Sequence, residues 1–296
     1  MNQKLSVVIP TKNRKDDLFE TLGSVFGQSV LPYEVIIIDQ SNSKIDYASM
    51  CSFANAKNIN FKVIYDPKIK GLTQARNIGL DNMKGDIVLF LDDDVILDKD
   101  YIEQISATYN YNSLDEVLGV GGVIRNSNNN HRVIGFEDIF NKGKLNHTRK
   151  GYSDINIDLS HTRYLYGCNM SFDIRKIADL KFDENYTGYS HGEDVDFCYQ
   201  ASKKGRLILN KKAKVLHKES QVGRVGPQRI SNEIYFYWYF LCKNIGFRFT
   251  TLVCYLWLNL GLVSRPIMKF RFEMYGGILD GYRRILQSII TGKSQW

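Results

Sequence analysis

Three consecutive carboxylates, Asp92, Asp93 and Asp94, follow five apolar residues at positions 87–91. Such a run is typical of a strand buried on both faces, so the carboxylates would emerge together at its end. Clustered anions repel one another unless a cation lies among them. Hard oxygen ligands suit Mg²⁺ or Mn²⁺, which proteins bind through a few carboxylates together with substrate phosphates. A solvated acidic turn is the alternative, and the triplet alone leaves both interpretations open.

Two single polar residues could bind a nucleotide. Asp39 ends the apolar run 36–38, where its carboxylate could accept hydrogen bonds from a nucleobase or a ribose hydroxyl. Taken alone, its position favours an Asx turn with Ser41. Arg76 falls in the opening turn of a helix predicted at 72–83, where a phosphate could meet the guanidinium and backbone N–H groups. A lone Arg at such a position is usually a surface residue.

The elements that would position these groups alternate between strand and helix. Short apolar or β-branched runs predict buried strands at 5–9, 35–38, 61–65 and 87–91. Between the first two strands, apolar residues recur with helical spacing at Leu18, Leu22, Val25 and Phe26. The order predicts a parallel α/β sheet with its ligand groups at the carboxyl ends of the strands. The polar groups that follow three of these strands would then meet in one crevice.

The second half of the chain is less regular. Residues 126–160 are polar and predict a long loop or an insertion on the acceptor side. Order returns at 164–174, and Gly192, Glu193 and Asp194 precede a helix predicted through 199–203, with a strand at 206–209. From Glu233 onward the pattern is aromatic and helical. Taken alone, the acidic pair at 193–194 is explained by an acidic helix start.

Five segments taken together are more specific than any one of them. The residues at 7–14, 36–39, 71–79, 90–94 and 192–194 resemble those of family 2 glycosyltransferases in order and approximate spacing. The resemblance extends over residues 4–220. It implies a GT-A fold, an α/β fold with a mainly parallel central sheet, and transfer of a sugar from a nucleotide-diphosphate donor with inversion. The Q-x-x-R-W signature of processive members is missing, which favours transfer of a single sugar.

The resemblance assigns the nucleotide side of the site. Pro10, Thr11, Arg14 and Asp39 would line the nucleotide, and Arg76 would face the ribose or the diphosphate.

The resemblance also assigns a metal side. Asp92 and Asp94 match the outer positions of the family's D-x-D motif, so Asp94 would bind Mg²⁺ or Mn²⁺ directly, and Asp92 would serve the ribose or a metal-bound water. Asp93 is acidic too and is counted with the nucleotide-sugar contacts, so either pair could chelate. His217 would supply a further metal ligand, and Asn169 would contact the donor sugar. Such an ion would neutralise the charge that develops on the departing diphosphate.

The acceptor side falls at 192–194. Glu193 and Asp194 resemble the family's E-D signature, whose aspartate is the general base. An acceptor hydroxyl has a very high pKa and must lose its proton as it attacks, which a carboxylate about 3 Å away can accept. Asp194 is therefore the expected base, and Glu193 would hold an acceptor hydroxyl. Asp196 would face the opposite side or cap the helix.

The charge of the chain is concentrated at its C-terminal end. The 296 residues include 39 basic and 32 acidic side chains, a net charge of +7. Residues 1–220 contain 29 of each sign, whereas residues 221–296 contain 10 basic and 3 acidic side chains and 15 of the 37 aromatic residues. This composition predicts docking to the cytoplasmic face of a membrane, where a lipid-linked acceptor would lie. The basic side chains expected there are Arg265, Lys269, Arg271, Arg283 and Arg284.

Other interpretations of the C-terminal part remain open. It could pack on the catalytic domain or form a homo-oligomer interface, while nucleic acid is disfavoured because the rest of the chain has no basic excess. Its longest uncharged stretch, 249–264, has 16 residues, fewer than the roughly 20 that cross a bilayer. We therefore expect interfacial helices. The expected organisation is a catalytic domain at 1–220, with a nucleotide-sugar half at 1–115 and an acceptor half at 116–220, and a membrane-associating region at 221–296.

Composition restricts the remaining possibilities. Hydrophobic residues make up 44% and charged residues 24%, which is ordinary globular usage. The five cysteines form no C-x-x-C pair and predict reduced core thiols. The first apolar run is too short for a signal peptide, so we expect a cytoplasmic protein. A nucleotidyltransferase or phosphohydrolase would also need clustered carboxylates and a metal, and a non-catalytic sugar- or lipid-binding module is a third possibility. A dinucleotide oxidoreductase is disfavoured, since neither Gly-rich phosphate motif occurs.

Overall fold

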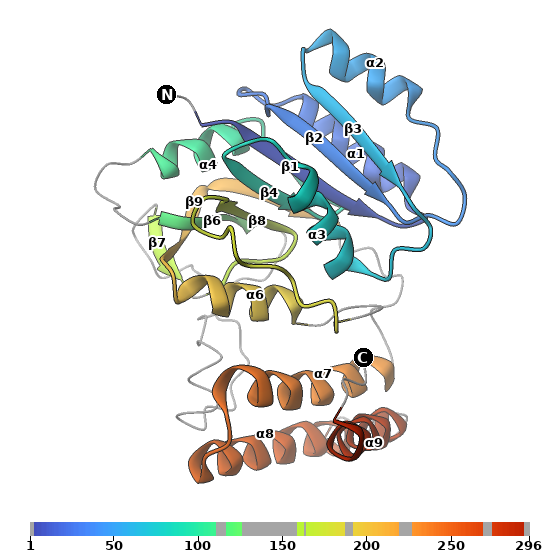
Figure 1. The fold of residues 1–296 in the computed structure, drawn as a ribbon, viewed down its shortest axis with the longest axis vertical. Helices are drawn as coiled ribbons and strands as arrows, with labels where there is room; N and C mark the ends of the chain where they lie inside the picture. The colour runs from blue at the N-terminus through green and yellow to red at the C-terminus, as the bar shows by residue number, and fades with distance from the viewer. Residues whose placement is uncertain are drawn as a thin grey trace. The chain divides into compact units, whose positions relative to one another are not determined.

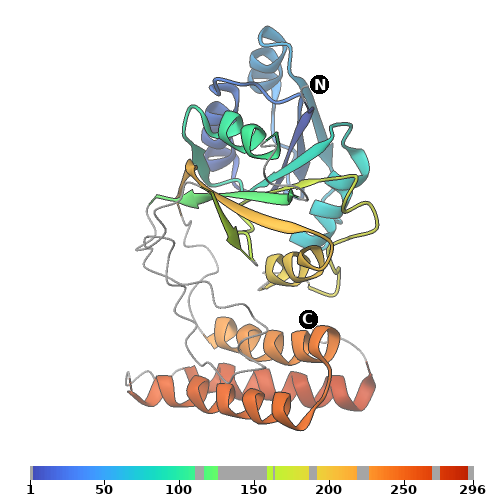
Figure 2. The ribbon, with the colours of Figure 1, turned by 90° about the vertical axis from the view of Figure 1, so that its left-hand side faces the viewer.

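The computed structural model describes residues 3–110, 117–125, 159–162, 164–186, 192–218, 227–268 and 274–292. The chain divides into two compact units (Figures 1 and 2). The first consists of Met1–Asn129, Tyr152–Glu184 and Glu193–Ser220, and the second of Asn130–Gly151, Asn185–Gly192 and Gln221–Trp296. The polar stretch predicted at 126–160 lies almost entirely outside the described residues.

The first unit begins with four parallel strands in the order β3-β2-β1-β4. They are β1 (Leu5–Thr11), β2 (Glu34–Asp39), β3 (Asn60–Tyr65) and β4 (Ile87–Leu91). Every residue of β1, β2 and β4 is buried, as their apolar runs predict, whereas β3 forms the edge of the sheet and is partly exposed. The parallel sheet expected from the first hundred residues is confirmed.

Three helices connect these strands. They are α1 (Lys15–Phe26), α2 (Ala48–Ala56) and α3 (Leu72–Asn82). In Figure 1, α3 crosses in front of the strands and α1 lies behind them. Helix α1 buries the four apolar residues that predicted it. Helix α2 was not predicted, because it buries only Ala54 and so has no apolar face to read from the sequence.

Beyond β4 the sheet becomes mixed and continues in the order β4-β8-β6-β9-β5, with β7 paired to β9. Its strands are β5 (Val95–Leu97), β6 (Val117–Ile124), β7 (Leu159–Thr162), β8 (Asn169–Asp173) and β9 (Arg206–His217). Strand β8 runs antiparallel to both β4 and β6, while β6 and β9 are parallel. Helices α4 (Tyr101–Tyr109) and α6 (Glu193–Ser202) complete the described part of this unit.

The second unit is helical in its described part, as the sequence predicted from residue 233 onward. It contains α7 (Pro227–Phe240), a π-helical turn (Leu241–Ile245), α8 (Phe249–Met268) and α9 (Tyr275–Thr291). Helices α7 and α9 approach closely at Gly277, where a Cβ atom would lie 1.9 Å from the carbonyl oxygen of Pro227. Within the described residues, no helix combines the length and the apolar character that crossing a bilayer requires.

Candidate active site

The three aspartates form the turn between β4 and β5, and Arg14 pairs with both Asp93 (3.2 Å) and Asp94 (3.8 Å). Thr21 of α1 holds the backbone of this turn, because its hydroxyl donates to the carbonyl oxygen of Asp93 (2.9 Å) and accepts from the N–H of Val95 (3.1 Å). The N–H of Asp92 donates to the carbonyl oxygen of Cys168 at the start of β8 (3.3 Å). Two neighbouring elements therefore fix the turn.

His217 is brought to this turn by the pairing of β5 with β9. Val95 is opposite His217 in the antiparallel ladder, and the N–H of Lys218 donates to the carbonyl oxygen of Asp94 (2.9 Å). The Nε2 atom of His217 lies 3.1 Å from Asp94 Oδ1 and 3.9 Å from Asp92 Oδ2. One potential ligand atom from each of these three residues lies within 4.8 Å of the others.

The donor set of this cluster fits a divalent cation. Two carboxylates and an imidazole are ligands that Mn²⁺ accepts, and carboxylates are also the usual protein ligands of Mg²⁺. Burial alone would lower the pKa of His217, but the adjacent Asp94, together with Cys168 and Asp92, raises it to about 11. A proton on His217 thus balances the anionic cluster, in the position that a metal ion would take.

The side chain of Asp93 contacts Thr11 and Arg14, two residues that were expected to line the nucleotide. Its Oδ2 accepts a hydrogen bond from the Thr11 hydroxyl (2.7 Å) and its Oδ1 from Nη1 of Arg14 (3.2 Å). Burial raises the pKa of Asp93 to about 6, although the hydrogen bond from Thr11 and the charge of Arg14 lower it. The structure therefore brings Thr11, Arg14 and Asp93 together at the carboxyl ends of β1 and β4, which run side by side.

Asp39 and Pro10 lie deeper in the same part of the sheet. Pro10 is buried within β1, and Thr11 is paired with Asp39 across the β1–β2 ladder. Asp39 is completely buried, and its carboxylate accepts from the N–H of Ser41 (2.9 Å) and the hydroxyl of Tyr47 (3.1 Å). The Asx turn that the sequence offered as an alternative is thus present. A nucleobase contact would have to share the carboxylate with these donors.

Arg76 joins the aspartate turn to Glu193 at the start of α6. It projects from α3 and is only 1% exposed, with Nη2 3.4 Å from Asp92 Oδ1 and Nη1 3.1 Å from Glu193 Oε1. The guanidinium also lies over the rings of Phe182 and Phe90, with centroids 5.3 and 5.9 Å away. Buried charges need such partners. The surface position usual for a lone arginine does not apply here.

Asp194 begins α6 beside Glu193 and is held by hydrogen-bond donors. Its Oδ2 accepts from the hydroxyl of Tyr164 (2.7 Å) and from the N–H of Gly167 (3.1 Å), while the carboxylate stays half-buried. Burial, followed by repulsion from Asp194, raises the pKa of Glu193, and Arg76 acts against this shift. A Cβ atom on Gly167 would lie 3.1 Å from Asp194 Oδ2 and 3.2 Å from Arg76 Nη2, so Asp194 and Arg76 border the same narrow space.

Asn169, which the resemblance implies as a contact of the donor sugar, lies at the start of β8. It is completely buried in β8, and its Oδ1 accepts from the N–H of Gly122 (2.8 Å). Its Nδ2 donates to Cys168 Sγ (3.5 Å). The bond from Gly122 connects β6 to β8, and a contact of Asn169 with the donor sugar stays a prediction. Asp196 is also buried, in the first turn of α6.

Three residues of the site were missed by sequence reasoning. Each uses its hydroxyl group: Thr21 holds the aspartate turn, Tyr47 holds Asp39, and Tyr164 holds Asp194. Each lies on a different element from its partner, 72, 8 and 30 residues away in the chain. A lone hydroxyl residue has no spacing signal, so only the fold reveals these contacts.

The sheet order and this cluster together define a class, the GT-A type of nucleotide-sugar transferase fold. A mannosyltransferase of Pyrobaculum calidifontis, solved with GDP-Man and Mn²⁺, matches 99% of this chain and 77% of its own with a TM-score of 0.59 and 14% identity. Staphylococcus aureus TarS matches 92% of this chain and 44% of its own, with a TM-score of 0.54 and 17% identity. At these identities the similarity establishes the fold alone.

The sequence matches identify the family. The model of "Glycosyl transferase family 2" matches residues 6–178, more than half of the chain, so the protein belongs to that family. The amylovoran biosynthesis glycosyltransferase AmsB of Erwinia amylovora is 28% identical over 211 residues, which are 68% of this chain and 64% of AmsB. A glucosyl-dolichyl phosphate glucuronosyltransferase of Haloferax volcanii is 24% identical over 73% of this chain and 69% of its own. The match to Streptococcus pneumoniae GlyA spans only 15% of that protein.

Proposed function

We propose that this chain transfers one sugar, with inversion, from a nucleotide-diphosphate donor to an acceptor hydroxyl. The observation that carries the proposal is the position of Arg76, whose buried guanidinium contacts Asp92 on one side and Glu193, next to Asp194, on the other. The Arg76 guanidinium thus lies between a cluster suited to a metal ion with its bound diphosphate and the neighbour of Asp194, whose half-buried carboxylate is suited to accept a proton. Sugar transfer needs both of these groups within reach of one substrate pair.

Asp92, Asp94 and His217 are the residues that would hold Mg²⁺ or Mn²⁺. When bound, such an ion neutralises the negative charge of the departing diphosphate. Arg14 and Arg76 are the nearby cations of the chain itself and are suited to phosphate oxygens. Thr11, Pro10 and Asp39 complete the nucleotide side of the proposal.

On the acceptor side, Asp194 would accept the proton of the attacking hydroxyl. Tyr164 and Gly167 orient Oδ2 of Asp194, and Glu193 would hold a second hydroxyl of the acceptor. The raised pKa of Glu193 suits this role, because a protonated carboxyl group can donate to a sugar oxygen as well as accept from one. Removing the proton in step with the attack avoids a free alkoxide.

The proposed donor is a UDP- or dTDP-sugar and the proposed acceptor is a lipid-linked glycan in cell-surface polysaccharide synthesis, such as O-antigen or capsule. Two relatives support this choice of acceptor: AmsB is a glycosyltransferase of amylovoran biosynthesis, and the Haloferax enzyme is a glucosyl-dolichyl phosphate glucuronosyltransferase. We further propose that the reaction takes place at the cytoplasmic face of a membrane, with residues 1–220 as the catalytic domain.

Replacement of Asp194 by Asn tests the assignment of the base. We expect transfer to fall at least 100-fold, in the range of a lost general base, while donor binding by titration calorimetry is unchanged. Asp81→Asn, an exposed carboxylate on α3, is the matched control and should retain full activity. Full activity in Asp194→Asn would refute Asp194 as the base.

Binding of UDP, GDP, dTDP and CMP, each measured with and without Mn²⁺, tests the donor class. Manganese-dependent binding of one diphosphate, lost in Asp94→Ala, is expected. The reaction product separates the remaining enzyme classes, since a sugar transfer releases the nucleoside diphosphate, whereas a nucleotidyltransferase releases pyrophosphate. Pyrophosphate as the product would overturn the proposal.

A further inference from the structure

Helix α8 exposes large apolar side chains along one face, while its buried residues include polar ones as well as Tyr255 and Leu258. Thr251 and Asn259 are 1% and 5% exposed, whereas Phe249 and Trp257 are 84% and 52% exposed. The large exposed residues recur with helical spacing on one face: Phe249, Leu252, Val253, Leu256, Trp257 and Leu260. A helix on the surface of a water-soluble domain has the opposite arrangement, with its apolar stripe inward.

Helix α9 repeats this arrangement. Its large exposed side chains are Leu279, Tyr282, Leu286, Ile289 and Ile290. Its buried side includes Arg284, whose Nη1 donates to Ser231 Oγ (3.2 Å) and Asn232 Oδ1 (2.8 Å) on α7. Arg284, one of the basic residues expected at a membrane, therefore serves the interior of this unit instead.

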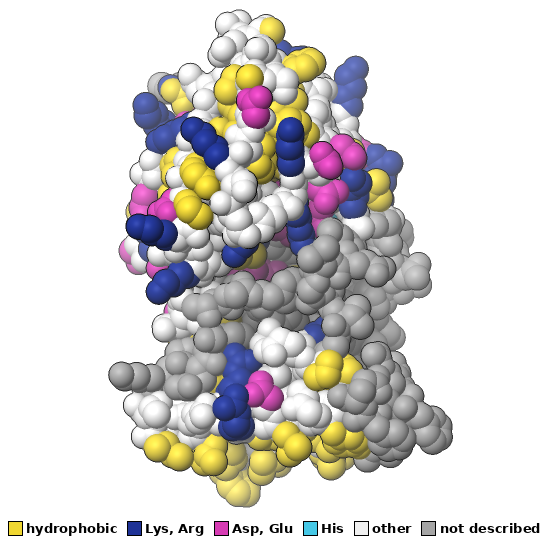
Figure 3. Space-filling view, turned by 90° about the vertical axis from the view of Figure 1, so that its right-hand side faces the viewer, with side chains coloured by type: hydrophobic (Ala, Val, Ile, Leu, Met, Phe, Trp, Pro, Cys, Tyr) yellow, Lys and Arg dark blue, Asp and Glu magenta, His cyan; other side chains and the backbone are white. Residues whose placement is uncertain are grey.

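The outward faces of α8 and α9 form one surface, which we call the α8–α9 face. Tyr282 of α9 donates its hydroxyl to Asn259 Oδ1 of α8 (2.8 Å), so the two helices are held side by side. Trp238 of α7 packs on Tyr255 of α8 and donates to Ser288 of α9 (3.2 Å), which supports both helices from behind. Figure 3 shows hydrophobic side chains gathered along the lower edge of the molecule, over this part of the unit.

This surface is exceptional within the described part of the chain. Of the 16 large hydrophobic residues exposed there, 12 lie between Phe247 and Ile290, and the others are Val30, Leu31, Phe53 and Leu216. Monomeric soluble proteins rarely expose contiguous apolar patches of this kind. Polar side chains occupy buried positions on the inner sides of both helices. The exposure of the apolar side chains therefore does not result from a lack of buried positions. The α8–α9 face therefore has an apolar partner.

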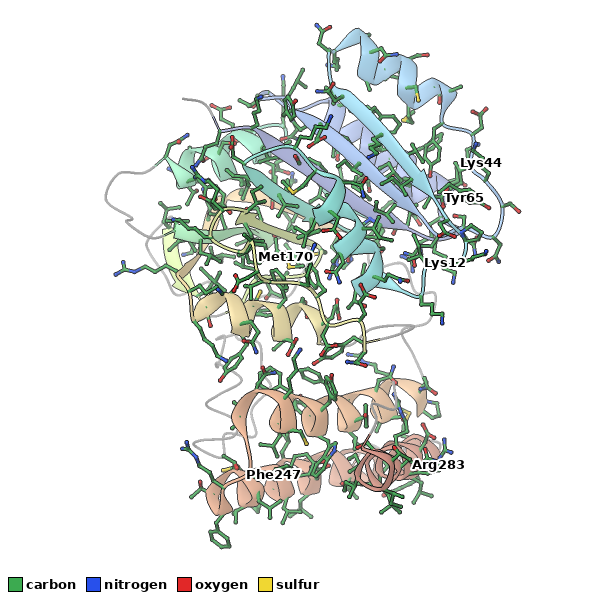
Figure 4. The ribbon with its side chains drawn as sticks, in the orientation of Figure 1. Lys12, Lys44, Tyr65, Met170, Phe247 and Arg283 are labelled. Atoms are coloured by element: carbon green, nitrogen blue, oxygen red, sulfur yellow. The ribbon has the colours of Figure 1, made fainter. Side chains whose placement is uncertain are left out.

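The charges around the α8–α9 face identify the kind of partner. Lys243 and Arg248 are exposed just before α8, and Arg283 is exposed on α9, where the acidic Asp280 is paired with it (2.7 Å). Figure 4 labels Phe247 and Arg283, which lie toward the ends of this helical layer. A second copy of the chain would bring cations against cations, whereas an anionic lipid surface attracts them. Trp257 and Tyr282 are side chains that favour the headgroup level of a bilayer.

We propose that the α8–α9 face docks on an anionic phospholipid bilayer, with both helices in the plane of the interface and their apolar side chains among the upper acyl segments. No step of sugar transfer enters this inference, because vesicle binding is measured without donor or acceptor. Failure of the transferase assignment and failure of the docking assignment are thus separate results.

Co-sedimentation of the full chain with lipid vesicles tests the proposal. Vesicles of phosphatidylcholine with 30% phosphatidylglycerol should bind the protein, and pure phosphatidylcholine should bind it at least tenfold more weakly. The double variant Leu256→Glu/Leu286→Glu places one charge on each helix of the α8–α9 face and should weaken binding at least tenfold. Phe53→Glu, an equally exposed apolar residue on α2, is the matched control and should bind like the unchanged chain.

A second variant and a second measurement make the result decisive. The variant Arg283→Glu should weaken binding to anionic vesicles only. In a second measurement, brominated lipids should quench the tryptophan fluorescence of the unchanged chain more strongly than that of Trp257→Phe. Equal binding of the double variant and the unchanged chain would overturn the proposal. So would an absence of vesicle binding, and light scattering would then show whether the α8–α9 face is covered by a second copy that the double variant releases.

Discussion

At the scale of single residues, Asp194 depends on Tyr164 for its orientation. The Tyr164 hydroxyl donates to the same oxygen, Oδ2, that accepts from the N–H of Gly167, so the two donors fix the direction of the carboxylate. A hydrogen bond to a charged group is worth about 1.5–3 kcal/mol. In the proposed reaction, Tyr164 would therefore position the Asp194 carboxylate.

Tyr164→Phe tests this role. We expect kcat to fall roughly tenfold, because a loss of about 1.4 kcal/mol in the transition state corresponds to that factor, with the KM for the donor unchanged. Steady-state kinetics measure both parameters. Tyr33→Phe, a half-buried tyrosine beside Lys4, is the control and should leave kcat unchanged. Equal loss in both variants would show that Tyr164 has no specific role.

The pKa of His217 predicts how metal binding depends on pH. Because that pKa is raised to about 11, the imidazole binds a proton throughout the neutral range, and a cation must displace it. The affinity for Mn²⁺ should therefore rise with pH, by about tenfold per unit for one released proton. The number of protons released when Mn²⁺ binds is measured by calorimetry in buffers of different ionisation enthalpy. His217→Gln should lose this proton release, and an affinity independent of pH would exclude His217 as a ligand.

The residues of the acidic cluster could be predicted from the resemblance to the family, but their contacts could not. Asp92, Asp94 and His217 were expected as metal ligands, and the fold brings them into one cluster although the histidine is more than 120 residues away in the chain. The sequence did not distinguish Asp93 from its neighbours, since only the hydrogen bonds from Thr11 and Arg14 show which way that side chain turns. Asn169 lies in a segment that resembles one of the family. Its burial could not be predicted, because it depends on the pairing of β8 with β4, which is distant in the sequence.

At the scale of elements, the close packing of α3 on β1 sets the position of Arg76. Gly79 lies one turn after Arg76, and a Cβ atom there would come within 2.3 Å of a methyl group of Val8. Val8 is completely buried in the central strand of the parallel part, so it has little room to move. The helix can approach the sheet this closely only because residue 79 has no side chain.

Gly79→Ala should destabilise the fold by about 1–3 kcal/mol, the usual cost of overpacking, and lower kcat by shifting Arg76. Val8→Ala removes the opposing methyl groups and should be destabilising by itself, by roughly 1–3 kcal/mol. The double variant should cost clearly less than the sum, because the two changes relieve each other. Denaturant unfolding of the four proteins measures this coupling. Strict additivity would mean that the contact does not limit the approach of α3.

The elements themselves were predictable to different degrees. Strands β1, β2 and β4 are apolar throughout, so the sequence located them within two residues. Strand β9 extends eight residues beyond the predicted segment, because exposed lysines alternate with buried residues in its second half and only the ladder with β5 and β6 shows it as strand. Helix α2 has almost no buried face, so it has no periodicity to detect.

At the scale of the whole molecule, the two units should respond to different ligands. Nucleotide and Mn²⁺ together should slow backbone hydrogen exchange in the first unit, around β4, α3 and the start of α6, and leave α8 and α9 unchanged. At 100 times the Kd, bound ligand stabilises a fold by about 2.7 kcal/mol. Anionic vesicles should protect α8 and α9 instead. Mass spectrometry of exchange resolves both patterns, and protection of α8 and α9 by nucleotide alone would contradict this division.

The shared guanidinium of Arg76 has a consequence for the order in which substrates bind. Before the donor arrives, the guanidinium of Arg76 contacts both Asp92 and Glu193. A diphosphate that contacts Arg76 would compete with Glu193 for this cation. The acceptor would then meet Glu193 paired with Arg76 before the donor binds, and Glu193 released from Arg76 afterwards. We therefore expect a compulsory sequence with the donor first. Product inhibition by the nucleoside diphosphate should then be competitive against the donor and noncompetitive against the acceptor.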